Sequence, residues 1–214
     1  MKPFEELTVR GRNRRLRASA LAALDAFGVA PSSMRLLAHD TNTVFAVRTE
    51  HGRRLVVRVG FVGSIGHPVR QIRSEMAWLA ALAGSGIRAP VPLETADGRR
   101  VVEIDVPGVP GPRPCVVMEW IPGHMLSDDI GADSMDAYGD LAARLHDHGA
   151  AYRPEQGGPV PRHDEVFPFD EPVVLYDGDH RHLPPQRRAR FIAAAARVES
   201  AIDELRARGG PMQV

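Results

Sequence analysis

Apolar residues recur about every three to four positions in several stretches of the chain, which is the spacing of one helical face. The stretches cover residues 14–27, 69–83 and 185–208, and each is followed by glycine. Glycine commonly ends helices, because it adopts the left-handed conformation without strain. We therefore predict a helix in each stretch. A further helix is predicted to begin near Ser134, whose hydroxyl suits the N-cap position.

Residues 34 to 121 mostly show a different pattern, with alternating or β-branched residues in short runs bounded by turn residues. These runs predict strands at residues 34–39, 44–49, 55–59, 91–93, 100–104 and 114–121. His51-Gly52 and Asp97-Gly98 are turn dipeptides that connect neighbouring runs. The first three runs are therefore expected to form an antiparallel meander.

The order of these elements divides the chain into three parts. A helical segment covers 1–30, a β-rich part with one inserted helix covers 31–122, and a helix-rich part covers 123–214. Pro122-Gly123 marks the change from strands to helices. Strands and helices that are segregated in this way predict the α+β class, with an antiparallel sheet.

Composition and charge exclude several classes of function. The chain has 27 basic and 27 acidic residues, whereas a dedicated nucleic-acid binder carries a basic excess, so no nucleic-acid partner is expected. No run approaches the ~20 apolar residues of a membrane span, so no membrane partner is expected either. Cys115 is the single cysteine, which rules out an intramolecular disulfide and favours a cytoplasmic location. We expect its thiol to be buried and inert.

Five short strings follow one another along the chain in a characteristic order. They are HDTNTVFAV at 39–47, LVVRV at 55–59, SEMAWL at 74–79, VVMEWIPG at 116–123 and GDLAARLH at 139–146. In order and spacing they resemble the aminoglycoside phosphotransferase and homoserine-kinase-like family, whose fold is protein-kinase-like. The resemblance implies that 31–122 is the kinase-like N-lobe and that 123–214 is part of the helical C-lobe.

The family resemblance also implies an ATP-binding site. The turn after the first strand would lie over the nucleotide phosphates, and the strand that ends at Ile121 would form a hinge whose backbone holds the adenine edge. An ordinary β-turn and a plain core strand are the alternatives. The cofactor-binding residues expected on this basis are Thr41, Asn42, Thr43, Val44, Val56, Arg58, Glu75, Met118, Glu119, Trp120 and Ile121.

Arg58 stands where kinases most often have a lysine that contacts the α- and β-phosphates. Val57 and Val59 point to the opposite face of the strand, so Arg58 shares a face with Val56. A charge on an inward face needs a partner, and the resemblance implies that Glu75, in the following helix, provides it. An exposed arginine on an alternating strand is the other interpretation.

The residues that perform phosphoryl transfer are missing from the sequence. A kinase needs a His-Gly-Asp or His-Arg-Asp loop followed by Asn, and a second Asp for Mg²⁺, but Asn occurs only at Asn13 and Asn42. No catalytic residue and no metal ligand is therefore assigned, and the Mg²⁺ ligands are expected beyond Val214. We interpret residues 153–183 as a long irregular connection and 212–214 as the start of the strand that leads to the catalytic loop.

Three hypotheses follow. The first is an ATP-dependent phosphotransferase that acts on a small-molecule hydroxyl, truncated before its catalytic segment and inactive alone. The second is a non-catalytic nucleotide- or partner-binding module, and the third is a remnant of the fold without a ligand. Asp128 and Asp129 would either meet a cationic substrate amine or provide negative charge at a helix N-terminus. An apolar face left uncovered in the helical part predicts self-association.

Overall fold

The computed structural model describes residues 2–61, 69–123, 131–153 and 184–209. By its internal contacts the chain divides into two compact units, Met1–Pro159 and Val160–Val214. The first unit contains a five-stranded sheet and three helices, and the second contains one described helix. The α+β class predicted from the sequence is confirmed.

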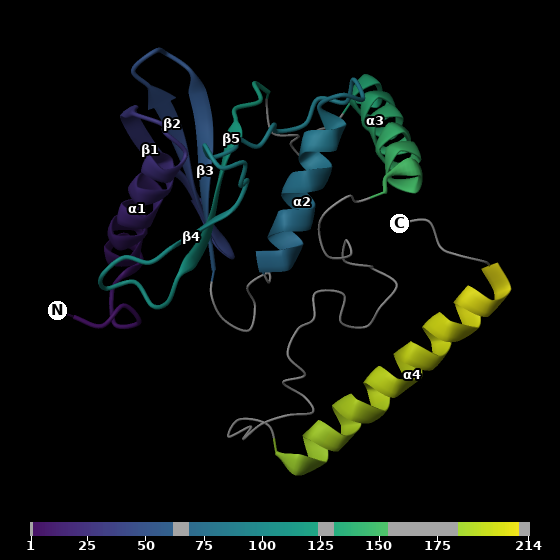
Figure 1. Cartoon of the computed structure of the whole chain (residues 1–214). Helices are drawn as coiled ribbons and strands as arrows, with labels where there is room; N and C mark the ends of the chain where they lie inside the picture. Colours follow the sequence, from purple (N-terminus) through teal and green to yellow (C-terminus); the bar gives the residue numbers. More distant parts are fainter. Residues whose placement is uncertain (1, 62–68, 124–130, 154–183, 210–214) are drawn as a thin grey trace. The chain divides into compact units, whose positions relative to one another are not determined.

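The sheet is antiparallel throughout, in the order β1-β2-β3-β5-β4 (Figure 1). The predicted meander is confirmed by the pairing of the first three strands. The strands are β1 (Pro31–His39), β2 (Asn42–Thr49), β3 (Arg54–Gly60), β4 (Val102–Ile104) and β5 (Arg113–Glu119).

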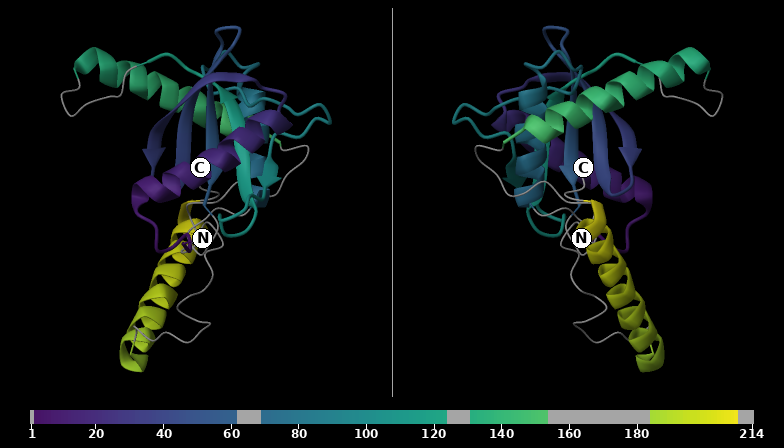
Figure 2. Two further views of the ribbon diagram at one scale, coloured as in Figure 1. Left: turned by 90° about the vertical axis from the view of Figure 1, so that its left-hand side faces the viewer. Right: turned by 90° about the vertical axis from the view of Figure 1, so that its right-hand side faces the viewer.

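Each face of the sheet is covered by a different helix (Figures 1 and 2). Leu55, Val57 and Val59 of β3 pack in the larger apolar cluster with the buried side of α1 (Val9–Ala26). Val56 packs in a second cluster with α2 (Val69–Leu82). Because side chains alternate along a strand, the strand β3 contributes to the apolar clusters on both faces of the sheet. The left view of Figure 2 shows α1 lying across its face of the sheet.

Helix α1 begins earlier than the apolar periodicity predicts. The prediction starts at residue 14, but Thr8 is the N-cap, and its hydroxyl accepts a hydrogen bond from the Gly11 N–H at 3.2 Å. A capped first turn needs no apolar residues of its own, so periodicity alone does not detect it. The helix ends at Ala26, and Gly28 follows in the left-handed conformation with a φ of 66°.

Helix α3 (Ala132–Ala151) also departs from its predicted start. Gly131 is the N-cap, and Ser134 lies within the first turn, where its N–H bonds to the Gly131 carbonyl. The predicted capping role of Ser134 is therefore wrong. The far end of α3 contacts α2, where Trp78 Nε1 donates a hydrogen bond to His148 Nδ1 at 3.0 Å.

The strand predicted at 91–93 is not formed as a regular strand. The segment is extended and pairs with β5 through an isolated bridge between Pro92 and Met118 and through the Leu93 N–H, which bonds to the Val117 carbonyl at 2.8 Å. Pro90 and Pro92 have no N–H to donate, so a continuous ladder cannot form. The strand predicted at 100–104 is shorter, and β5 ends at Glu119 rather than at Ile121.

The second unit contains α4 (Pro185–Gly209), which agrees with the predicted helix. The predicted irregular connection, the strand start at 212–214, and Asp128 and Asp129 lie outside the described residues. Among the residues that are described, no helix has both the length and the apolar character needed to cross a bilayer.

Candidate functional site

Arg58 on β3 and Glu75 on α2 form a bidentate ion pair on the α2 side of the sheet. The two terminal guanidinium nitrogens of Arg58 donate to the two carboxylate oxygens of Glu75 at 2.7 and 2.6 Å. The Arg58 side chain is 18% exposed and that of Glu75 is 41% exposed. The pair predicted from strand alternation and from the family resemblance is therefore present.

The ion pair leaves part of the guanidinium available to an anion. Arginine has five N–H donors in a planar fork, and Glu75 engages two of them. Across the described ranges, Arg58 has no hydrogen-bond acceptor besides Glu75. Val44 and Val116 stand opposite Arg58 on the two neighbouring strands and cannot neutralise its charge. Glu75 thus holds a fixed cation in one orientation on this face.

An apolar pocket lies beside this cation, two residue pairs further along β3 and β5. Its volume is about 180 Å³, below the range of roughly 300–1,000 Å³ that is common for small-molecule pockets. Val56 and Met118 stand opposite each other in the strand register and contribute to its wall. The lining residues are Val56, Pro90, Met118, Glu119, Trp120 and Ile121.

The structure therefore brings five of the predicted residues to one pocket and places Arg58 and Glu75 next to it. Pro90 was not among the residues predicted to bind the cofactor. It belongs to the extended segment that runs beside β5, and only the tertiary pairing of Pro92 with Met118 brings that segment to the pocket. No local pattern in the sequence signals that role.

The backbone at the end of β5 offers fewer free donors than the sequence predicts. The Glu119 N–H bonds to the Val91 carbonyl at 2.8 Å, and the Trp120 N–H bonds to the Arg54 carbonyl at 3.2 Å. Neither amide can donate to a ligand without breaking these bonds. The Ile121 N–H has no acceptor in the described part of the chain. Among the described amides of Glu119, Trp120 and Ile121, that of Ile121 is therefore the one left to donate a hydrogen bond to a ligand.

The turn between β1 and β2 is tight, and the side chain of Thr43, near the start of β2, faces away from the α2 layer. The Asp40 N–H bonds to the Asn42 carbonyl at 3.0 Å. Thr43 is 3% exposed, and its hydroxyl is hydrogen-bonded to His39 Nδ1 at 2.8 Å on the α1 side of the sheet. Any contact of Thr43 with a ligand on the α2 face is thus restricted to its backbone. Thr41 is exposed, and Asn42 is half-buried.

The sequence matches an established family over most of its length. A sequence model of the phosphotransferase enzyme family matches residues 33–214. A protein of Deinococcus radiodurans that is itself uncharacterized is 30% identical over 198 residues, which cover 89% of this chain and 51% of that protein.

Two solved kinase structures resemble the chain. The microcompartment-associated aminopropanol kinase has a TM-score of 0.55 and 31% identity, and the match covers 67% of this chain and 44% of that one. Amicoumacin kinase hAmiN, in complex with AMP-PNP, Ca²⁺ and Ami, has a TM-score of 0.57 and 20% identity, covering 86% and 56%. The second likeness concerns the fold alone. The fold is therefore kinase-like, and the chain spans about half the length of the relatives it matches.

Proposed function

The chain belongs to the phosphotransferase enzyme family, and from that membership we propose that it forms the nucleotide-binding part of an ATP-dependent kinase. The phosphoryl acceptor in this proposal is a hydroxyl group of a small molecule. The observation that carries the proposal is the Arg58–Glu75 pair beside the apolar pocket on the same sheet face. A fixed cation next to an apolar slot suits a ligand with an anionic end and a flat apolar end.

Each part of the nucleotide has a proposed contact on this face. The adenine ring occupies the apolar pocket between Val56 and Met118, where the Ile121 N–H donates to the edge of the base. Arg58 holds the charge of the α- and β-phosphates with the donors that Glu75 does not engage. The backbone of the turn at Thr41 and Asn42 lies over the phosphates, and Val44, opposite Arg58, lines the space between base and turn.

The magnesium ion and the catalytic base are proposed to be held by residues that lie outside this 214-residue chain. Mg²⁺ neutralises the phosphate charge that develops during transfer. The sequence contains no His-Gly-Asp or His-Arg-Asp loop with a following Asn. The relatives it matches are about twice as long as the matched part, which supports a catalytic segment in the part of the relatives that this chain does not cover. We therefore expect the chain alone to bind nucleotide without transferring phosphate.

The two similar kinases support a small-molecule acceptor. One is an aminopropanol kinase, and the other is amicoumacin kinase, whose structure holds AMP-PNP and a divalent ion. Both are small-molecule kinases, and their shared fold makes the present chain a candidate for the same class of reaction. In this proposal the acceptor is selected by residues outside the described site.

Binding of ATP to the 214-residue chain and its variants tests the proposal. Charged hydrogen bonds contribute roughly 1.5–3 kcal/mol each, so R58M should weaken ATP binding by about 10- to 150-fold, measured by calorimetry. R73M is the matched control. Arg73 lies on α2 in a looser, more exposed pair with Glu103, at 3.7 Å and with 62% of its side chain exposed, so its loss should leave the affinity unchanged. Equal affinity of R58M and wild type would contradict the proposed site.

We also propose that the chain self-associates through the exposed side of α3. Met135, Tyr138 and Leu141 are 49%, 55% and 38% exposed and lie at helical spacing on one side of the helix. An apolar stripe of this kind gains free energy when it is covered. Sedimentation velocity should show a dimer that dissociates on dilution, and Leu141→Glu should shift it to monomer. A monomer at every concentration would contradict this proposal.

A further inference from the structure

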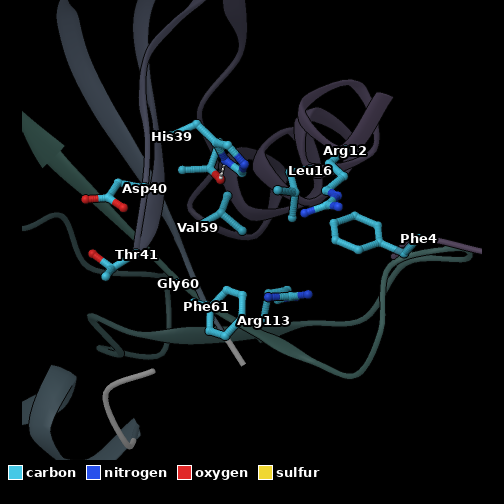
Figure 3. A pocket seen from close by; sticks show the side chains of 11 residues that line it. Phe4, Arg12, Leu16, His39, Asp40, Thr41, Val59, Gly60, Phe61 and Arg113 are labelled. Atoms are coloured by element: carbon cyan, nitrogen blue, oxygen red, sulfur yellow. Dashed lines mark hydrogen bonds between the residues drawn. The ribbon is translucent and has the colours of Figure 1, made fainter. Parts of the chain in front are cut away.

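A second pocket lies on the opposite side of the sheet from the proposed nucleotide site (Figure 3). It opens between the N-terminal half of α1, the end of β3 and the start of β5, with a volume of about 130 Å³. Val59 and Thr43, which line it, belong to the α1 face. The residues with polar or aromatic side chains around it are Phe4, Arg12, His39, Asp40, Thr41, Thr43, Phe61 and Arg113.

Arg113 is a buried cation in this pocket without an anionic partner. Only 4% of the residue is exposed, and its Nε has no hydrogen-bond acceptor. No carboxylate in the described ranges forms an ion pair with it. Its guanidinium instead lies 5.6 Å from the ring centroids of both Phe4 and Phe61. Burial lowers the pKa of the Arg113 guanidinium, because desolvation disfavours its charged form.

A charge in this position is costly unless a ligand compensates it. An uncompensated buried ion is strongly unfavourable, whereas an apolar side chain of similar size would not be. The two aromatic rings return part of that cost through cation–π attraction. They do not satisfy the N–H donors, so the group remains available for a strong acceptor.

A second guanidinium faces the same space. Arg12 donates from Nε to the Leu7 carbonyl at 3.2 Å and from one terminal nitrogen to the Glu5 carbonyl at 3.0 Å, which fixes its side chain. Figure 3 shows Arg12 next to the Phe4 ring and Arg113 next to the Phe61 ring. His39, held by Thr43, completes the polar wall.

The acidic groups nearby do not neutralise the pocket. Asp40 lines its other end, is exposed, and points away from Arg113 in Figure 3. Glu5 acts on Arg113 only through its charge, without an ion pair between them. Two arginines therefore face a space whose one lining carboxylate, that of Asp40, lies at its far end.

We propose that this pocket is a binding site for a small oxyanion, a carboxylate or a phosphate group, which Arg113 holds through its unsatisfied Nε–H and its terminal N–H groups. Arg12 supplies a second positive charge, and the rings of Phe4 and Phe61 exclude water from the contact. The cation of this site differs from that of the proposed nucleotide site, because Arg113 projects to the α1 face and Arg58 to the α2 face. The turn at Thr41 borders both sites.

Nitrogen-15 spectra of arginine side chains test the proposal directly on the full 214-residue chain. Sodium phosphate and sodium acetate are titrated in turn, with sodium chloride at matched ionic strength as the control. We expect the Arg113 Nε–H resonance, identified by its absence in R113M and R113K, to shift and saturate with an oxyanion and not with chloride. A response to phosphate alone identifies a phosphoryl ligand, and a response to acetate as well identifies a carboxylate-tolerant site.

Thermal unfolding gives a second measurement that does not depend on a folded variant. The wild-type midpoint should rise with the anion that shifts the resonance, relative to chloride, because ligand binds only the native state. The proposal is overturned if Arg113 Nε–H does not shift, or if the shift follows ionic strength alone. It is also overturned if ATP displaces the anion competitively, since the pocket would then belong to the nucleotide site.

Discussion

Replacing Glu75 by glutamine removes the carboxylate that compensates Arg58 and leaves the shape of the side chain intact. The amide oxygen can still accept one hydrogen bond, while the second contact and the negative charge are lost. Exposed ion pairs contribute roughly 0.2–1 kcal/mol, and breaking a fully buried pair costs roughly 3–5 kcal/mol. Arg58 is 18% exposed and Glu75 41% exposed, so E75Q should lower the free energy of unfolding by about 1–2 kcal/mol.

Glu103 provides a matched control for this change. Its side chain is 44% exposed, close to that of Glu75, but it meets Arg73 through a single contact of 3.7 Å, and Arg73 is 62% exposed. E103Q should therefore cost at most about 0.5 kcal/mol. The two variants differ in the geometry of the pair and in the burial of its cation, and hardly in the exposure of the residue replaced.

Urea unfolding followed by tryptophan fluorescence measures both variants. The chain has two tryptophans, Trp78 and Trp120, which lie in the unit that contains the sheet, so the signal reports on that unit. Unchanged slopes with a lower midpoint for E75Q would show a change in stability alone. If E75Q is no more destabilised than E103Q, the bidentate pair does not hold Arg58 in place, and Arg58 is not prearranged for a phosphate.

Two further predictions concern the sheet. Burial raises the pKa of the Cys115 thiol from an ordinary value of 9.0 to about 12, so the native thiol should not react with thiol reagents at neutral pH. Because only the unfolded chain loses this proton between pH 9 and 12, stability should fall across that interval by up to about 4 kcal/mol, and less in C115V. A Cβ on Gly60 would lie 2.7 Å from Pro114 Cγ, so G60A should cost about 1–3 kcal/mol in urea unfolding, and an unchanged midpoint would show that β5 can shift.

The sequence alone predicted strand faces and helices correctly where side chains repeat with a strong period. Alternation in β3 assigns Arg58 to the face opposite Val57 and Val59, and the structure places these residues as predicted. The long helices were found because an apolar stripe persists over several turns. The predicted starts of two helices were less accurate. The start of α1 is set by the N-cap Thr8, and α3 starts after Gly131, which makes no side-chain capping bond.

The pockets depend on contacts between distant parts of the chain and were only partly predictable. Pro90 reaches the first pocket because the segment around Pro92 pairs with β5. In the second pocket Arg12, His39 and Arg113 come from α1, β1 and β5. Arg113 stands in a proline- and glycine-rich stretch, where the sequence gives no sign that its side chain is buried.

The backbone amide spectrum of the chain during titration with ATP tests the central claim most directly. We predict saturable shifts at Val56, Arg58 and Ile121, the residues that surround the apolar pocket and the cation beside it. Amides of α4, in the other compact unit, should stay unchanged. Saturable binding with shifts confined to residues away from the α2 face, or no shift at any ATP concentration, would contradict a nucleotide site at the Arg58–Glu75 pair.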